Sequence, residues 1–164
     1  MLSKLKSVSV ILLALTFLIN TKTKAQTGKL FPFQIMRPNG KIFTAQNLPY
    51  EKPIVIIYFS PDCEDCLSFM DKFFTRIKDF DKASVVMISY FPIKDLAKFS
   101  VKYKTANYKN IIVGTEGSSF FVKDYYKIMD LPFAALYDKD GNIQSSYQKN
   151  IPINELISKL KKLR

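Results

Sequence analysis

The chain has 164 residues and a formal net charge of +11, with no histidine and only two cysteines, Cys63 and Cys66. Without the N-terminal segment described next, this length is still enough for one domain with a hydrophobic core. A tetrahedral zinc site needs four ligands, which are mostly cysteine and histidine. Two cysteines without histidine do not supply them, so no metal site is expected.

The start of the chain has the pattern of a secretory signal peptide. Lys4 and Lys6 make a basic beginning, and residues 8–19 make an apolar core. Residues 23–25 then place small side chains at the −3 and −1 positions of a cut before Gln26. The apolar run is short for a membrane span, although an uncleaved anchor is the alternative. Export implies an oxidising compartment, and a bacterial periplasm fits best.

We therefore expect residues 1–25 to be a signal peptide and residues 26–164 to be one mature domain. The signal segment carries four lysines and no acid, so its removal lowers the net charge from +11 to +7. A solvated helix face explains the remaining lysine-rich runs, and an anionic partner is the alternative. Nucleic acid is not an expected partner of an exported chain.

The first elements of the expected domain lead to the two cysteines. Residues 31–35 and 41–44 flank a Pro-Asn-Gly turn and predict a short hairpin. Residues 54–59 form an apolar run typical of a buried strand, and the sequence Cys63-Glu64-Asp65-Cys66 follows at once. Apolar residues then recur at helical spacing as far as Phe80. The dithiol is thus predicted where a strand ends and a helix begins.

That position has a chemical consequence for the cysteine pair. The unpaired N–H groups and the positive end of a helix favour a thiolate, which is the reactive form of cysteine. Two cysteines at this spacing also close and reopen a small disulfide ring. A half zinc site and a static structural bridge are the alternatives, but a bridge over so short a loop restricts the unfolded chain little. Redox exchange is the favoured interpretation.

Strands and helices alternate through the rest of the chain. The predicted elements are a strand over 84–90, a helix over 93–103, a strand over 110–113, a helix over 120–129, a hairpin of 133–137 with 143–147, and a last helix that begins at Pro152. This order, which closes on an antiparallel hairpin, predicts an α/β domain with a mixed sheet.

In this order the chain resembles the thioredoxin fold, and specifically the exported TlpA/ResA-like and AhpC/TSA-like thiol-disulfide proteins. The resemblance rests on the Asn39-Gly40-Lys41 turn, on the strand into the C-x-x-C pair, and on Leu131-Pro132-Phe133 with the Asp-Lys-Asp-Gly turn after it. It covers roughly residues 28–163. It implies a three-layer sandwich, a central mixed sheet flanked by helices, and no bound cofactor.

The resemblance also implies roles for particular residues. Cys63 would attack a substrate disulfide and Cys66 would resolve the mixed disulfide. The Leu131–Pro132 bond would be a cis peptide that faces the dithiol, which leaves the backbone of Leu131 to pair with a substrate strand. An ordinary trans proline at a strand entry is the alternative.

Some residues depart from the family pattern. Asp62 stands where a tryptophan usually precedes the first cysteine, and Ile57 stands where thioredoxin has a buried acid. The proton acceptor for Cys66 is then unidentified. Glu116 is one candidate, and an exposed loop acid is the alternative reading of it.

Three carboxylates, Asp62, Glu64 and Asp65, surround Cys63 in the sequence. Their charge opposes a thiolate while the helix dipole favours one, so we expect them to tune the pair toward reducing behaviour.

The leading hypothesis is a monomeric periplasmic oxidoreductase that reduces disulfides of exported proteins. It would receive electrons from a membrane donor of the DsbD or CcdA type. A peroxiredoxin is the first alternative, because Ser60 lies three residues before Cys63, although Ile56 replaces a proline and Cys66 lies unusually close. A binding module on a thioredoxin scaffold, with only structural cysteines, is the second.

Overall fold

The computed structural model describes residues 28–49 and 51–163. The expected signal segment, residues 1–25, lies outside them. The seven strands are β1 (Gln34–Met36), β2 (Ile42–Thr44), β3 (Ile54–Tyr58), β4 (Ser84–Ser89), β5 (Ile111–Thr115), β6 (Phe133–Tyr137) and β7 (Ile143–Gln148). They form one mixed sheet in the order β2-β1-β5-β4-β3-β6-β7. The three central strands, β3, β4 and β5, are parallel, and the outer pairings are antiparallel.

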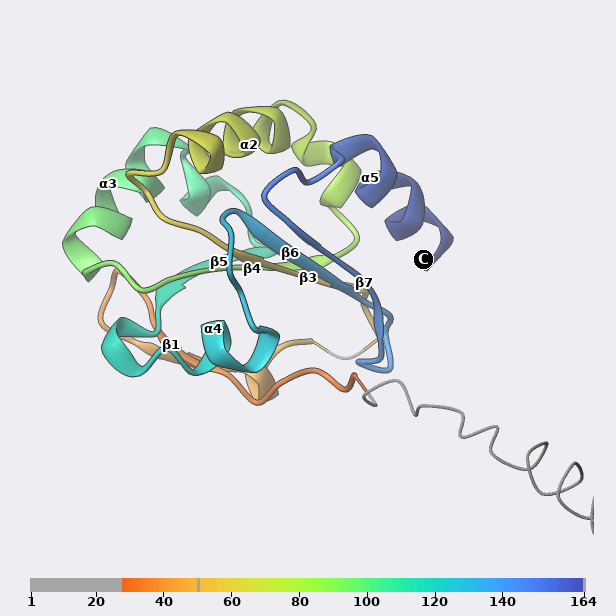
Figure 1. Cartoon of the computed structure of the whole chain (residues 1–164), viewed down its shortest axis with the longest axis horizontal. Coiled ribbons are helices and arrows are strands. Elements are labelled where there is room, and N and C mark those ends of the chain that lie inside the picture. The colour runs from red at the N-terminus through yellow and green to blue at the C-terminus, as the bar shows by residue number, and fades with distance from the viewer. Residues whose placement is uncertain (1–27, 50, 164) are drawn as a thin grey trace, which may run out of the picture.

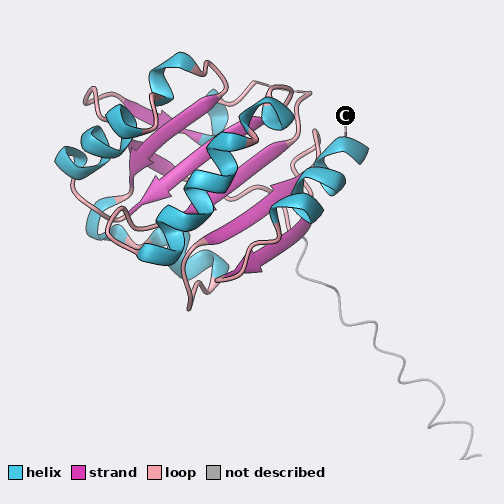
Figure 2. Cartoon of the chain, turned by 90° about the horizontal axis from the view of Figure 1, so that it is seen from above, coloured by secondary structure: helices cyan, strands magenta, loops and turns pink. Residues whose placement is uncertain are grey.

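The sheet is the middle layer of an α/β sandwich (Figure 1). The α-helices among the described residues are α2 (Glu64–Thr75), α3 (Ile93–Lys102), α4 (Phe121–Tyr126) and α5 (Ile153–Lys162). Helices α2, α3 and α5 cover one face, and α4 lies on the other with the β1–β2 hairpin (Figure 1). From above, α2 runs across the middle of the sheet (Figure 2). The predicted α/β class and three-layer arrangement are confirmed.

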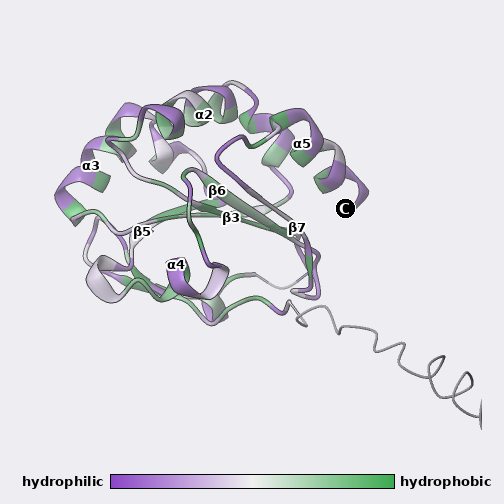
Figure 3. Ribbon diagram, in the orientation of Figure 1, coloured by the Kyte–Doolittle hydropathy of each residue, from purple (hydrophilic) through white to green (hydrophobic). Residues whose placement is uncertain are grey.

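Strand β3 is buried over its whole length because both faces of the sheet are covered. Val55 and Ile57 pack in the core beneath α2, α3 and α5. Ile54, Ile56 and Tyr58 pack in a second core on the α4 face. The helices turn their apolar residues toward the sheet and their polar residues outward (Figure 3). Burial on both faces explains why this strand reads as a continuous apolar run.

Two predicted helices end earlier than their apolar spacing suggests. The helix after the cysteines ends at Thr75, and a separate 3-10 helix spans Ile77–Phe80, because the backbone of Arg76 leaves helical geometry between them. The helix expected over 120–129 is only Phe121–Tyr126, since Lys127 takes a left-handed conformation with φ of 51°.

In the part of the chain that the structure describes, no helix combines the length and apolar character needed to cross a membrane.

Gly114 lies where β1 meets the edge of β5. The two strands pair there through Met36 and Thr115. A Cβ atom on Gly114 would lie 2.8 Å from Cδ1 and 2.9 Å from Cγ1 of Ile35, and 3.0 Å from the carbonyl oxygen of Met36. Ile35 is itself 1% exposed, so the core holds it in place. Glycine lets the two strands approach this closely.

We therefore expect Gly114→Ala to lower the free energy of unfolding by about 1–3 kcal/mol through overpacking. Ile35→Val removes the nearest carbon, so the double variant should lose less stability than the sum of the two single variants. Urea unfolding of all four proteins measures this coupling. Additivity to within about 0.5 kcal/mol would contradict the proposed clash.

Candidate functional site

The cysteine motif follows the carboxyl end of β3 after a single tight turn of the chain. The N–H of Phe59 donates to the carbonyl of Ile88 at 3.0 Å, which extends the pairing with β4 past the strand. The N–H of Cys63 then donates to the carbonyl of Ser60 at 3.3 Å and closes a tight turn. This turn places Cys63 at the N-terminus of α2, which is the position that the sequence predicts.

Cys63 is the N-cap residue of α2. Its sulfur accepts a hydrogen bond from the backbone N–H of Cys66 at 3.3 Å. Its carbonyl oxygen accepts the first helical bond, from the N–H of Leu67, at 2.9 Å. An N–H group and the positive end of the helix therefore both stabilise negative charge on the Cys63 sulfur.

The two cysteines differ sharply in exposure. Both carry free thiols, and Cys63 is half-buried whereas Cys66 has no exposed surface. Burial raises the pKa of the Cys66 thiol well above its ordinary value, and the adjacent Cys63 sulfur adds to the rise. A backbone hydrogen bond with Ser60 partly opposes it. A solvent-accessible sulfur thus lies in front of a shielded thiol that stays protonated at neutral pH.

The three acids of the motif are all exposed. Glu64 and Asp65 occupy the first turn of α2, where carboxylates stabilise a helix through its dipole. Asp62 accepts a hydrogen bond from the hydroxyl of Ser60, which is only 2% exposed. Sequence reasoning assigned these acids to redox tuning alone. The structure adds a favourable interaction with the helix dipole for Glu64 and Asp65 and a hydrogen-bond partner for Asp62.

The Leu131–Pro132 segment lies beside the motif. Strands β3 and β6 are antiparallel, with Tyr58 opposite Phe133, so the residues after β3 lie next to those before β6. The Leu131–Pro132 peptide bond is cis. Leu131 is half-buried against the same core as Cys63 and Cys66. The fold therefore brings together both sequence-predicted segments of the site.

Glu116 does not reach the thiols. Its carboxylate accepts a hydrogen bond from the Tyr58 hydroxyl at 2.6 Å and another from the N–H of Val122 at 2.7 Å. Tyr58 points into the core on the α4 face, whereas Cys66 lies in the core on the other face. Burial and this carboxylate raise the pKa of Tyr58. Glu116 is thus neither an exposed loop acid nor a proton acceptor for Cys66.

Gln148 is a residue near the site that sequence reasoning missed. Its side-chain oxygen accepts hydrogen bonds from the N–H groups of Met129 and Asp130, at 2.8 and 3.2 Å. These bonds fasten the loop before Leu131 to β7 and leave the Met129 side chain 86% exposed. A lone glutamine late in a strand gives no local signal of this contact.

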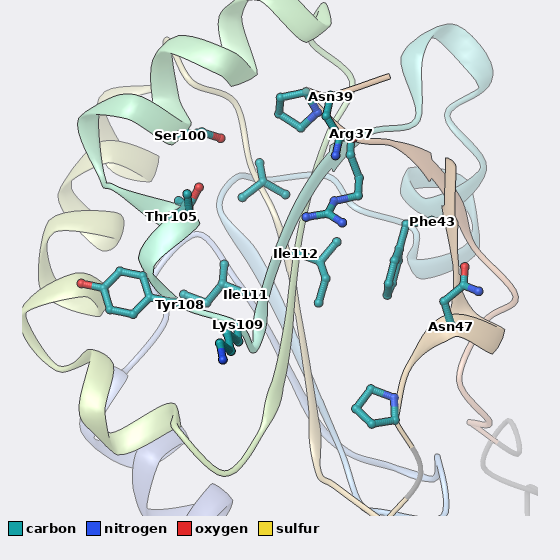
Figure 4. Close-up of a pocket in the computed structure, with 14 residues that line it drawn as sticks. Arg37, Asn39, Phe43, Asn47, Ser100, Thr105, Tyr108, Lys109, Ile111 and Ile112 are labelled. Atoms are coloured by element: carbon teal, nitrogen blue, oxygen red, sulfur yellow. The ribbon is translucent and has the colours of Figure 1, made fainter. Parts of the chain in front are cut away.

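A hollow lies near the amino end of β5, away from the cysteines (Figure 4). It lies between the β1–β2 hairpin and the helices around Ser100 and Thr105, and Arg37 points into it (Figure 4). Its wall includes Ile111 at the amino end of β5. Because β3, β4 and β5 are parallel, the dithiol lies at their other end.

No family model matches the sequence, and no curated protein matches it. Solved structures do. The exposed lipoprotein thioredoxin Etrx1 of Streptococcus pneumoniae strain TIGR4 is 21% identical, with a TM-score of 0.62 over 81% of this chain and 100% of that one. The chain has the thioredoxin fold.

Two further structures share this fold and come from Mycobacterium tuberculosis. A secreted disulfide oxidoreductase homologous to E. coli DsbE is 18% identical, with a TM-score of 0.67 over 80% of this chain and 96% of that one. Peroxidoxin BcpB is 17% identical, with a TM-score of 0.69 over 84% of this chain and 97% of that one. The fold is therefore shared by disulfide oxidoreductases and by peroxidoxins.

The difference in burial makes a prediction about the two thiols. Iodoacetamide should alkylate Cys63 at least about tenfold faster than Cys66 at pH 7, since only a reachable thiolate reacts. Timed alkylation of the reduced protein, followed by peptide mass spectrometry, measures both rates. Cys63→Ser and Cys66→Ser serve as single-thiol controls. Faster labelling of Cys66 would reverse the assignment of the two cysteines.

Proposed function

We propose that this protein is a periplasmic thiol-disulfide oxidoreductase that reduces disulfides of other exported proteins. The observation that carries the proposal is the arrangement at the start of α2. There the half-buried Cys63 sulfur caps the helix while Cys66 is buried behind it. Nucleophile and resolving thiol are thus one helical turn apart, as stepwise disulfide exchange requires.

The exchange has two steps. The Cys63 thiolate attacks one sulfur of the substrate disulfide, forms a mixed disulfide and releases the other substrate sulfur as a thiolate. Cys66 then loses its proton and attacks the Cys63 sulfur. This forms the Cys63–Cys66 disulfide and releases the second substrate thiol. Two electrons pass from the dithiol to the substrate, and a dithiol donor must return them.

Burial of Cys66 delays the second step. Because burial raises the pKa of Cys66, little Cys66 thiolate forms at neutral pH. The mixed disulfide therefore lasts long enough for the substrate chain to be held. Leu131, beside the motif, is the position at which we propose that a substrate strand binds.

We propose that electrons flow toward the substrate. Strong oxidants of this fold owe their potential to a stabilised thiolate in the reduced form. Here Asp62, Glu64 and Asp65 place negative charge around the motif, which weakens that stabilisation, although solvent screens exposed acids. A membrane dithiol donor of the DsbD or CcdA type would then keep the monomeric protein reduced.

The reduction potential tests this direction. Equilibration with dithiothreitol redox buffers should give a potential near the value of about −270 mV known for thioredoxin. Replacement of the three acids by their amides should shift it toward more oxidising values. A potential near about −120 mV would contradict a reductant, and one below about −300 mV would indicate a static structural bridge in a binding module.

A peroxidase is the second candidate, favoured by the similarity to peroxidoxin BcpB. Ser60 stands where such an enzyme would use a hydroxyl near its reactive cysteine. That hydroxyl is buried and donates to Asp62, so it is already engaged. We therefore expect the purified protein to reduce hydroxyethyl disulfide rapidly and to consume hydrogen peroxide no faster than free dithiothreitol does. The opposite pair of results would favour the peroxidase.

A further inference from the structure

A hollow of about 450 Å³ adjoins the nucleophile on the α3 side. Pro61 and Asp62, which immediately precede Cys63, line it together with Leu67 of α2. Leu67 is also the residue whose N–H binds the Cys63 carbonyl at 2.9 Å. Residues on both sides of Cys63 in the sequence therefore line this hollow, and Cys63 itself does not. A side chain within a few residues of a substrate cysteine bonded to Cys63 is close enough to enter it.

The inner surface of the hollow is apolar and firmly held. Phe99, only 4% exposed, contacts the buried ring of Phe59 with 4.5 Å between ring centroids. Phe91 and Leu67 are half-buried walls, and Pro61 forms another wall. When an apolar side chain of a substrate covers accessible apolar surface, water is released from both, and this stabilises the complex.

The α3 side of the hollow carries positive charge. Lys94, Lys98 and Lys102 are exposed and follow one another at four-residue spacing, so they share one face of α3. Lys98 and Lys102 border the hollow together with one acid of α3, Asp95. Lys98 is paired with Asp95 at 3.3 Å. Lys102 lies 4.9 Å from the centre of the Tyr103 ring and has no carboxylate partner within residues 28–49 and 51–163.

We propose that this hollow selects the substrate of the dithiol. It accepts a large apolar side chain located within a few residues of the substrate cysteine, and the lysines of α3 hold carboxylates beyond it. The acids of the motif repel a carboxylate next to Cys63, so the acidic part of the substrate must lie toward Lys102. The preferred partner is thus an exported polypeptide whose disulfide is flanked by an apolar and then an acidic stretch. This inference rests on the proposed oxidoreductase function.

The first test varies the substrate. The reference peptide is joined to a fluorescent reporter through a disulfide at its cysteine. It carries a leucine two residues from that cysteine and two glutamates beyond the leucine. One variant replaces leucine by serine, and another replaces both glutamates by lysines. We expect kcat/KM to fall about tenfold for the serine peptide, the scale on which a pocket discriminates between apolar side chains. The lysine peptide should react several-fold more slowly, with a difference that shrinks as salt rises.

The second test varies the protein and uses matched controls. Phe91→Ala should remove most of the preference for leucine, whereas Phe121→Ala, at a ring 69% exposed and outside this hollow, should not. Lys102→Gln should reduce the preference for glutamate. Lys72→Gln is its control, because Lys72 is also an exposed lysine in the last turn of a helix but does not line the hollow.

Hydroxyethyl disulfide separates this inference from the function on which it rests, since it is too small to fill the hollow. Its reduction should be unchanged, within about twofold, in all four variants. If the wild-type protein did not reduce hydroxyethyl disulfide, the proposed oxidoreductase function would be overturned. Retained activity with equal rates for all three peptides would overturn only the substrate preference. A dimer that Phe91→Ala converts to monomer in sedimentation would also overturn it, because the hollow would then bind a second copy.

Discussion

The helix that follows the cysteine motif, α2, is capped by sulfur. Cys63 occupies the position where oxygen-bearing side chains usually accept a bond from the first turn, and its sulfur binds the N–H of Cys66 at 3.3 Å. One hydrogen bond thus both caps the N-terminus of the helix and directs an N–H group at the Cys63 sulfur. The rest of the architecture serves to place Cys63 there. A strand buried on both faces leads to a tight turn, and α2 then packs across the sheet.

The sheet also separates the core around Cys66 from the partly buried hydrogen bonds on its other face. Cys66 lies in an apolar core beneath α2, and the bond between Glu116 and Tyr58 lies on the far side of β3. No buried carboxylate therefore stands behind Cys66 among the contacts of the described residues. Proton loss from Cys66 must then depend on water or on groups that arrive with the substrate.

Local patterns were sufficient to predict the strands and the place of the cysteines, because burial on two faces and helical spacing show in neighbouring residues. The place of Leu131–Pro132 beside the cysteines came only from the resemblance to the thioredoxin fold. Contacts between distant residues were not predictable. The bonds from Gln148 to the loop at Met129 join two segments that only the folded sheet brings together. The hollow formed by Phe91 and Phe99 likewise depends on how α3 packs beside the motif. The apolar spacing through Phe80 suggested one long helix, since spacing alone does not reveal the break at Arg76.

Capture of the mixed disulfide tests the central claim most directly. With Cys66→Ser, the resolving step is removed, and a disulfide-linked reporter peptide should remain attached to the protein. Intact mass spectrometry should then show one peptide half per protein, bound at Cys63 and released by dithiothreitol. Cys63→Ser should form no such adduct on the same timescale, because Cys66 is buried. A stable adduct at Cys66, or none on either variant while both remain folded, would contradict the account.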